Sequence, residues 1–178
     1  MWADLQQGRA ERVKEETELD MYRCVTRTLA RAGFEHYEVS NYARAGRRSQ
    51  HNQVYWRNEA YVGIGPGAVS YLDGTRSSNV KDVAGYIERL AQQGDATAES
   101  ETIDARKRAG ETAILGLRMT EGIDEEAFAS RTGFTLAELA GEEFERLISM
   151  GLLRREGGRI ALTKRGMEIG DSVMSEFM

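Results

Sequence analysis

The sequence predicts an α+β protein made of two parts. Helix and strand patterns alternate over residues 1–95, which is typical of an α/β unit. The stretch 94–101 is small and polar, and we interpret it as a linker. Beyond it, over residues 96–178, helices, one hairpin and a last helix follow one another. This order indicates a winged-helix-like module.

Apolar periodicity and glycines locate most of the elements. Helices are expected at about 11–32, 50–57, 103–118, 124–131 and 135–150. Gly33 should end the first of them, and a strand should follow at 34–40. Two strand-like pieces lie within 61–74, and a hairpin turns at Gly157 and Gly158.

Capping residues locate two more helices. Asn79 and Asp82 form a predicted N-cap pair for a helix that stops at Gly94. The apolar face of this helix consists of Val80, Val83, Ile87 and Leu90. Thr163 is expected to cap the last helix, in which Ile169, Val173 and Phe177 share a face.

Composition and charge exclude several classes of protein. The 178 residues are 40% hydrophobic and 30% charged, which is typical of a globular protein and not of a disordered one. No apolar run approaches the roughly 20 residues of a membrane helix, and the N-terminus lacks the apolar core of a signal peptide. We therefore expect a cytoplasmic protein. The net charge of −5 arises in residues 96–178, which carry 11 basic and 16 acidic side chains and should bind phosphate backbones poorly.

The chain has a single cysteine, Cys24. One cysteine excludes an intramolecular disulfide and a three-cysteine iron–sulfur site built by this chain alone. Cys24 lies in a helical pattern with Tyr22, Val25 and Leu29 at its apolar positions. We interpret it as a small core residue, with a reactive thiol as the alternative.

Two patterns suggest ligand binding, and each has a plainer interpretation. The glycine-rich sequence GIGPGA at 63–68 matches neither the Walker loop nor the dinucleotide fingerprint, and a tight turn between strands at Pro66 is the favoured interpretation. A winged-helix-like module suggests DNA binding, but its helix 135–150 contains four glutamates and only one arginine. The predicted hairpin at 152–162, which would be the wing of such a module, supplies a basic cluster of Arg154, Arg155 and Arg159. The charge pattern favours a structural or docking role over nucleic-acid binding.

The sequence HNQVY at 51–55 is the third candidate. In a helix, His51 and Tyr55 lie one turn apart and point the same way. Imidazole is a common axial ligand of haem iron, a tyrosine oxygen can ligate iron, and Asn52 could hold the loop. Alternatively, His51 caps the turn while Tyr55 and Trp56 pack into the core. The spacing alone favours this second interpretation, and it favours a structural role for His36.

Four blocks of sequence resemble the HemN/HemW group of radical S-adenosylmethionine (SAM) proteins. They are HYEVSNYAR at 36–44, HNQVYW at 51–56, YVGIGPGAVSYLDG at 61–74 and ILGLRMTEGID at 114–124. The ending GLLRREGGRIALTKRG at 151–166 is similar to the C-terminal domain of the same group. Within the group, HNxxY is the pattern of the HemW branch, and the resemblance implies a haem chaperone.

The resemblance implies specific roles. His51 would be the haem-binding histidine and iron ligand, with Asn52 and Tyr55 completing the motif. Gly63, Gly65 and Gly67 would be weak candidates for lining the cofactor site. Residues 1–95 would be the last strands and helices of an incomplete β/α barrel. Its open sheet edge would favour self-association or binding of a missing N-terminal half, and a haem-recipient protein is a further expected partner.

Two departures from the family pattern limit these implications. The family's CxxxCxxC motif holds a [4Fe–4S] cluster beside SAM, and this chain offers only Cys24, so radical chemistry by this chain alone is excluded. Val69 stands where the family usually has histidine. Two alternatives remain open: the C-terminal part of an oxygen-independent coproporphyrinogen III oxidase of porphyrin biosynthesis, which converts propionates to vinyl groups, and a nucleic-acid-binding module.

Overall fold

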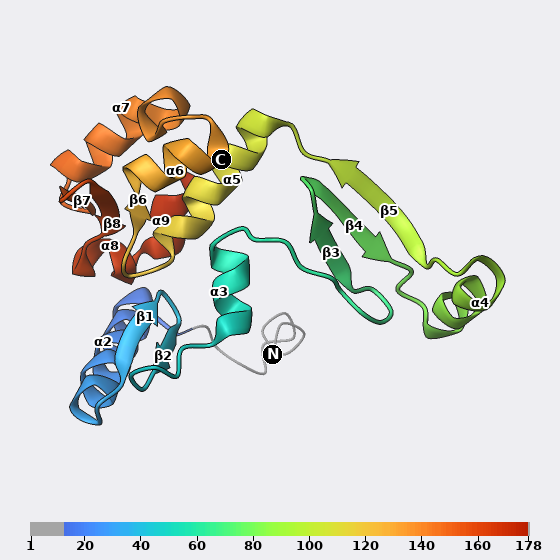
Figure 1. Cartoon of the computed structure of the whole chain (residues 1–178). Helices are drawn as coiled ribbons and strands as arrows, with labels where there is room; N and C mark the ends of the chain where they lie inside the picture. The colour runs from blue at the N-terminus through green and yellow to red at the C-terminus, as the bar shows by residue number, and fades with distance from the viewer. Residues whose placement is uncertain (1–12, 178) are drawn as a thin grey trace. The chain divides into compact units, whose positions relative to one another are not determined.

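The computed structural model describes residues 13–177, and it has the mixed helices and small sheets expected of an α+β protein (Figure 1). The chain divides into two compact units, residues 1–48 and 49–178. The predicted helix start at residues 11 and 12 lies outside the described residues. Every strand pairing in the described part is antiparallel. A β/α barrel is built from parallel strands, so the barrel assignment of residues 1–95 stays a prediction.

The first unit is a helix followed by a β-hairpin. Its elements are α2 (Glu15–Arg31), β1 (Glu35–Glu38) and β2 (Asn41–Ala43). Gly33, at φ +78°, turns the chain after the helix, as predicted. The hairpin buries Tyr37, and it also buries Glu38, whose Oε1 accepts hydrogen bonds from the backbone N–H of Ser40 and the side chain of Asn41.

The core assignment of Cys24 is wrong, because its thiol-bearing side chain is exposed. The half-buried positions of α2 are Leu19, Tyr22, Thr26 and Leu29. Cys24 follows Tyr22 by two residues, about 200° around the helix, and therefore lies on the opposite face. No residue of α2 is fully buried, so the hairpin covers only one narrow stripe of this helix.

The second unit begins with a short helix and a three-stranded sheet. Its elements are α3 (Gln50–Trp56), β3 (Val69–Leu72), β4 (Thr75–Asn79), α4 (Val83–Gln93) and β5 (Thr97–Thr102), and the strand order is β3-β4-β5. The predicted linker at 94–101 is largely β5, paired with β4 from Thr75 opposite Thr102. Its side chains are mostly exposed polar groups, so its sequence lacks the apolar alternation that marks a half-buried strand.

Asp82 caps α4 without Asn79. The Asp82 carboxylate accepts a hydrogen bond from the backbone N–H of Gly85 at 2.7 Å, whereas Asn79 belongs to β4 and donates to the carbonyl of Gly65. The helix ends at Gly94, as predicted. The predicted apolar face is present but not buried, since Val83, Ile87 and Leu90 are all exposed.

The rest of the second unit forms a helical module around a second three-stranded sheet (Figure 1). Its elements are α5 (Ala105–Leu117), β6 (Ile123–Asp124), α6 (Glu125–Thr132), α7 (Leu136–Ser149), β7 (Leu153–Glu156), β8 (Arg159–Leu162), α8 (Lys164–Glu168) and α9 (Gly170–Ser175). The strand order is β6-β8-β7. The buried core includes Leu117, Phe144, Leu147, Leu153, Ile160 and Val173. The helices at 103–118, 124–131 and 135–150 and the hairpin are therefore confirmed within a few residues.

The last predicted helix is broken. Thr163 caps α8 by accepting a hydrogen bond from the backbone N–H of Gly166, as expected. Ile169 then leaves helical geometry at φ −126° and α9 begins after it. The predicted common face is therefore split, since Val173 is buried while Ile169 is exposed.

Candidate functional site

The segment HNQVY lies on α3, whose first turn is closed by Ser49. The Ser49 hydroxyl accepts a hydrogen bond from the backbone N–H of Asn52 at 3.2 Å, and its carbonyl accepts one from the Gln53 side chain at 3.3 Å. His51 therefore does not cap the helix, which was half of the plainer interpretation. Its side chain is exposed in the first turn. Asn52 contributes to the cap through its backbone.

Four aromatic rings run from α3 to β3, and we call them the aromatic ladder: His51, Tyr55, Tyr61 and Tyr71. The His51 and Tyr55 rings meet edge to face, with centroids 4.8 Å apart. Tyr55 and Tyr61 are 4.6 Å apart, and Tyr61 and Tyr71 are 6.2 Å apart. Tyr61 and Tyr71 also exchange two backbone hydrogen bonds, at 2.9 and 2.8 Å. The ladder thus joins the candidate histidine to the sheet. The helical spacing predicted only its first contact, between His51 and Tyr55.

The far end of the ladder is polar. Burial raises the pKa of the Tyr61 phenol above its ordinary value, and the positive charge of Arg76 opposes this rise only partly. The phenol therefore stays neutral at physiological pH. Arg76 lies over the Tyr71 ring, 5.9 Å from its centroid, and pairs with Glu111 of α5 at 2.7 Å. The hydrogen bond to Glu111 also raises the pKa of Arg76.

The C-terminal end of α3 is attached to α5. The Arg118 guanidinium lies 4.3 Å from the centroid of the Trp56 ring, a cation–π contact. Asn58 has a left-handed backbone, at φ +50°, and its side-chain amide donates to the Thr112 hydroxyl at 2.9 Å. No local sequence pattern predicts these contacts, because the partners lie more than 50 residues apart along the chain.

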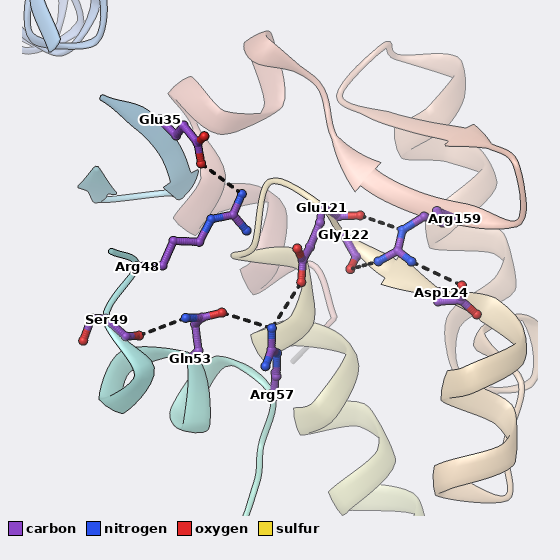
Figure 2. A network of polar contacts seen from close by, with 9 residues as sticks. All are labelled: Glu35, Arg48, Ser49, Gln53, Arg57, Glu121, Gly122, Asp124 and Arg159. Carbon is purple, nitrogen blue, oxygen red and sulfur yellow. Dashed lines mark hydrogen bonds and ion pairs between the residues drawn. The ribbon is translucent and has the colours of Figure 1, made fainter. Parts of the chain in front are cut away.

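A series of polar contacts continues from α3 to Arg159 in the hairpin of β7 and β8 (Figure 2). Arg57 donates to the Gln53 side chain at 3.0 Å and lies 3.6 Å from the Glu121 carboxylate. The carbonyl of Glu121 accepts from Arg159 at 3.0 Å, and Arg159 also pairs with Asp124 at 3.2 Å. Figure 2 shows these side chains converging on the turn between α5 and β6.

The glycine-rich loop forms a tight turn, as the residue pattern favoured. A side chain on Gly63 would bring its Cβ within 2.2 Å of the carbonyl oxygen of Val69. Gly65 and Gly67 have φ of +111° and +67°, where other residues are strained. Turn geometry therefore accounts for all three glycines, and their proximity to a cofactor stays a prediction. Ile64, just before the turn, is 88% exposed.

Gly63→Ala is expected to lower the free energy of unfolding by about 2–3 kcal/mol, because backbone atoms of β3 must move away from the new methyl group. Urea denaturation followed by circular dichroism measures the change. Gly110→Ala is the matched control, since its Cβ would meet nothing within 4 Å in the middle of α5. The control should gain stability by up to about 1 kcal/mol through helix propensity. An equal change in unfolding free energy in the two variants would contradict the close approach of Gly63 to the backbone of Val69.

The remaining candidate features are His36, possible groups of metal ligands and an open cavity. His36 stacks on Tyr42 with centroids 4.3 Å apart and hydrogen-bonds the carbonyl of Val39, which confirms its structural role. Residues 13–177 contain no group of three or more His, Cys, Asp or Glu side chains arranged to hold a metal ion. An open cavity of about 750 Å³ lies between α5 and α7, but its lining includes Arg76 and Phe144 and not His51.

None of the helices within residues 13–177 has the length and apolar character that a membrane-spanning helix needs.

Comparison with known proteins identifies the family. Residues 103–169 match the family model described as the HemN C-terminal domain. The chain is 34% identical over 174 residues to a Bacillus subtilis protein named heme chaperone HemW, covering 98% of this chain and 46% of that protein. The chain belongs to the HemN/HemW-like radical SAM family. Its match is to the C-terminal portion, as the sequence blocks indicated.

Three further proteins also match this chain over most of its length. A Lactococcus lactis heme chaperone HemW is 36% identical over 164 residues, covering 92% of this chain and 43% of that protein. A mouse mitochondrial protein named radical S-adenosyl methionine domain-containing protein 1 is 29% identical, covering 98% and 42%. The solved structure of Escherichia coli coproporphyrinogen III oxidase (HemN) has a TM-score of 0.73 over 93% of this chain and 42% of that chain, at 16% identity, which shows a shared fold. This chain thus spans less than half the length of the relatives it matches.

Proposed function

We propose that this chain binds haem as part of a HemW-like haem chaperone, with His51 as the ligand of the haem iron. The observation that carries the proposal is the exposed imidazole of His51 at the head of the aromatic ladder, within the HNxxY motif. The relatives from Bacillus subtilis and Lactococcus lactis are named heme chaperones, which supports the same cargo for this chain.

The residues present fit haem as a cargo. A haem site needs an accessible axial ligand beside apolar or aromatic side chains. Within residues 13–177, no other residue forms a hydrogen bond or ion pair with the His51 ring, so an imidazole nitrogen is free to ligate iron. Tyr55 supplies an aromatic edge directly beside it, and Asn52 holds the first turn of α3 closed. In this proposal Tyr55 supports the haem and His51 binds the iron.

The residues do not fit an iron–sulfur cluster. The family motif uses three cysteines, and the chain contains only Cys24. We therefore assign neither the cluster nor radical chemistry to these residues. Gly63, Gly65 and Gly67 remain proposed neighbours of the SAM site of a longer protein.

We also propose a division into a barrel-derived part, residues 1–95, and a winged-helix-like part, residues 96–178. The order α5, β6, α6, α7, β7 and β8 around one antiparallel sheet supports the second assignment. The wing arginines do not favour nucleic acid: Arg154 pairs with Glu156, Arg155 with Glu145, and Arg159 with Asp124. A docking role is the better proposal for this module.

An absorbance titration with haem tests the proposed function. The wild-type chain should show a saturable Soret shift, and His51→Ala should weaken binding at least about tenfold, because the iron–imidazole bond is lost. His36→Gln is the matched control, since it removes the chain's other histidine, and it should bind haem like the wild type. Tyr55→Phe should keep the Soret position. If His51→Ala and the wild type bind alike, His51 is not the ligand.

A further inference from the structure

The helix that carries His51 is too short to hold its own orientation. α3 has seven residues, Gln50–Trp56, about two turns. Isolated helices of this length are marginal in water, because few backbone hydrogen bonds offset the cost of nucleation. None of its residues is fully buried. The direction in which His51 and Tyr55 point must therefore be set by what α3 is attached to.

The first attachment is the hydrogen bond between Asn58 and Thr112. Thr112 is buried in the middle of α5, and its hydroxyl donates to the carbonyl of Arg108 at 2.8 Å. The hydroxyl oxygen is thereby oriented to accept from the Asn58 amide at 2.9 Å. Asn58 comes two residues after α3 ends, in a left-handed conformation that turns the chain away from the helix. This contact fixes the exit of α3.

The second attachment is the contact of Arg118 with Trp56, the last residue of α3. Only 18% of the Arg118 side chain is exposed, so its cation–π contact is largely shielded from water. Trp56 directly follows Tyr55, which holds the His51 ring edge to face. A shift of the Trp56 ring would therefore carry both members of the motif with it.

The other end of the aromatic ladder is tied to the same helix. Glu111, the residue before Thr112, pairs with Arg76, which lies over the Tyr71 ring. Neighbouring residues of α5 thus hold the α3 end of the ladder and, through Arg76 of β4, its β3 end. The ladder spans two elements that share this one rigid support.

We propose that α5 is the positioning element of the candidate haem site, with Thr112 and Arg118 as positioning residues that act through Asn58 and Trp56 on His51 and Tyr55. The proposal rests on the proposed haem-binding function. It gives the C-terminal module a defined task in that function: it sets the geometry of a ligand that lies on another part of the chain. Neither residue touches the haem in this proposal.

Thr112→Val is the main test, because it removes the hydroxyl acceptor and keeps the shape of the side chain. Haem binding should weaken about fivefold, the value of one net hydrogen bond, and Thr112→Ser should restore wild-type binding. In a His51→Ala background, Thr112→Val should weaken haem binding less than in the wild type, because the iron ligand that it positions is gone and only Tyr55 is left to position. Equal weakening in both backgrounds would overturn the proposal in favour of a merely structural role.

A second readout does not involve haem. The Tyr55 ring is expected to shift the proton resonances of His51 in the haem-free protein, because the two rings meet edge to face. Thr112→Val and Arg118→Gln should each move these resonances toward their values in an unfolded chain. Arg154→Gln, on the exposed wing, should leave them unchanged. Unchanged His51 resonances in folded Thr112→Val would overturn the proposal.

The two readouts separate the two hypotheses. Moved resonances together with haem binding that His51→Ala leaves intact would support positioning by α5 and reject the proposed ligand. Unchanged resonances together with a loss of haem binding in His51→Ala would reject the positioning and keep the ligand. Folding of each variant is checked by urea denaturation, and the comparison uses only conditions in which the variant is folded.

Discussion

Replacing Gly122 by alanine is expected to lower the free energy of unfolding by about 3–5 kcal/mol, because a left-handed backbone and a collision with a strand coincide at this position. Gly122 has φ +67°, and its Cβ would lie 2.2 Å from the carbonyl oxygen of Ile160 and 2.5 Å from the Cβ of Ala161. The new methyl group would therefore meet strand β8 beside its pairing with β6. Either the strands separate or the turn changes its path, and both disrupt the small sheet.

Gly133→Ala is the matched control for this change. Gly133 has a similar φ, +77°, but its Cβ would meet nothing within 4 Å. The control isolates the backbone strain, which should cost about 1–2 kcal/mol. Urea denaturation followed by circular dichroism measures both variants. If Gly133→Ala were as damaging as Gly122→Ala, the collision with β8 would not be the cause.

The Gly122 turn also lies within the series of polar contacts that connects α3 to the hairpin of β7 and β8. The carbonyl of Gly122 accepts a hydrogen bond from Arg159 at 3.3 Å, and the neighbouring Glu121 faces Arg57 (Figure 2). A variant that displaces this turn should therefore disturb Arg57 as well as the sheet. The Gly122 effect thus links the stability of the C-terminal module to the geometry around α3.

The fold was predictable where the signal is local. The helix that ends before Gly33 and the hairpin at Gly157 and Gly158 are marked by glycines with positive φ. Strand β5 was missed because its exposed face gives no apolar alternation. Asn79 and Asp82 were predicted to form a cap pair, but β4 extends to Asn79 and leaves Asp82 as the cap, which is a matter of strand pairing and not of local propensity.

The candidate site was predictable to the same extent. His51 and Tyr55 are one helical turn apart, so their contact follows from the spacing. Tyr61, Tyr71, Thr112 and Arg118 join them through tertiary contacts, and single-residue patterns do not show such partners. The Cys24 error has a related origin: an apolar stripe was recognised in α2, but the narrow hairpin selects which of its residues are covered.

The face of α4 illustrates a further limit of pattern reading. Its periodicity correctly marks Val83, Ile87 and Leu90 as one face, and yet the face is exposed. An amphipathic pattern states which side of a helix is apolar and does not state what covers it. The helix can therefore serve as a test of how far burial, and not residue type, determines stability in this chain.

Leu117→Ala makes that test, with an expected loss of about 3–4 kcal/mol of unfolding free energy through lost burial and the cavity left behind. Leu117 is the last residue of α5 and is fully buried, with 0% of its surface exposed. Ile87→Ala on α4 is the matched control, because Ile87 is 61% exposed, and it should change stability by no more than about 0.5 kcal/mol. Chemical denaturation of both variants measures the difference.

The variants Leu117→Ala and Ile87→Ala also test the proposed role of α5 in haem binding, because Leu117 precedes the proposed positioning residue Arg118. If α5 supports the haem site, Leu117→Ala should lose haem affinity in denaturant before Ile87→Ala does, in step with the unfolding of the C-terminal module. Haem affinity that survives after circular dichroism shows this module unfolded would mean that α3 orients His51 without α5. A Leu117→Ala variant as stable as Ile87→Ala would instead contradict the placement of Leu117 in the core.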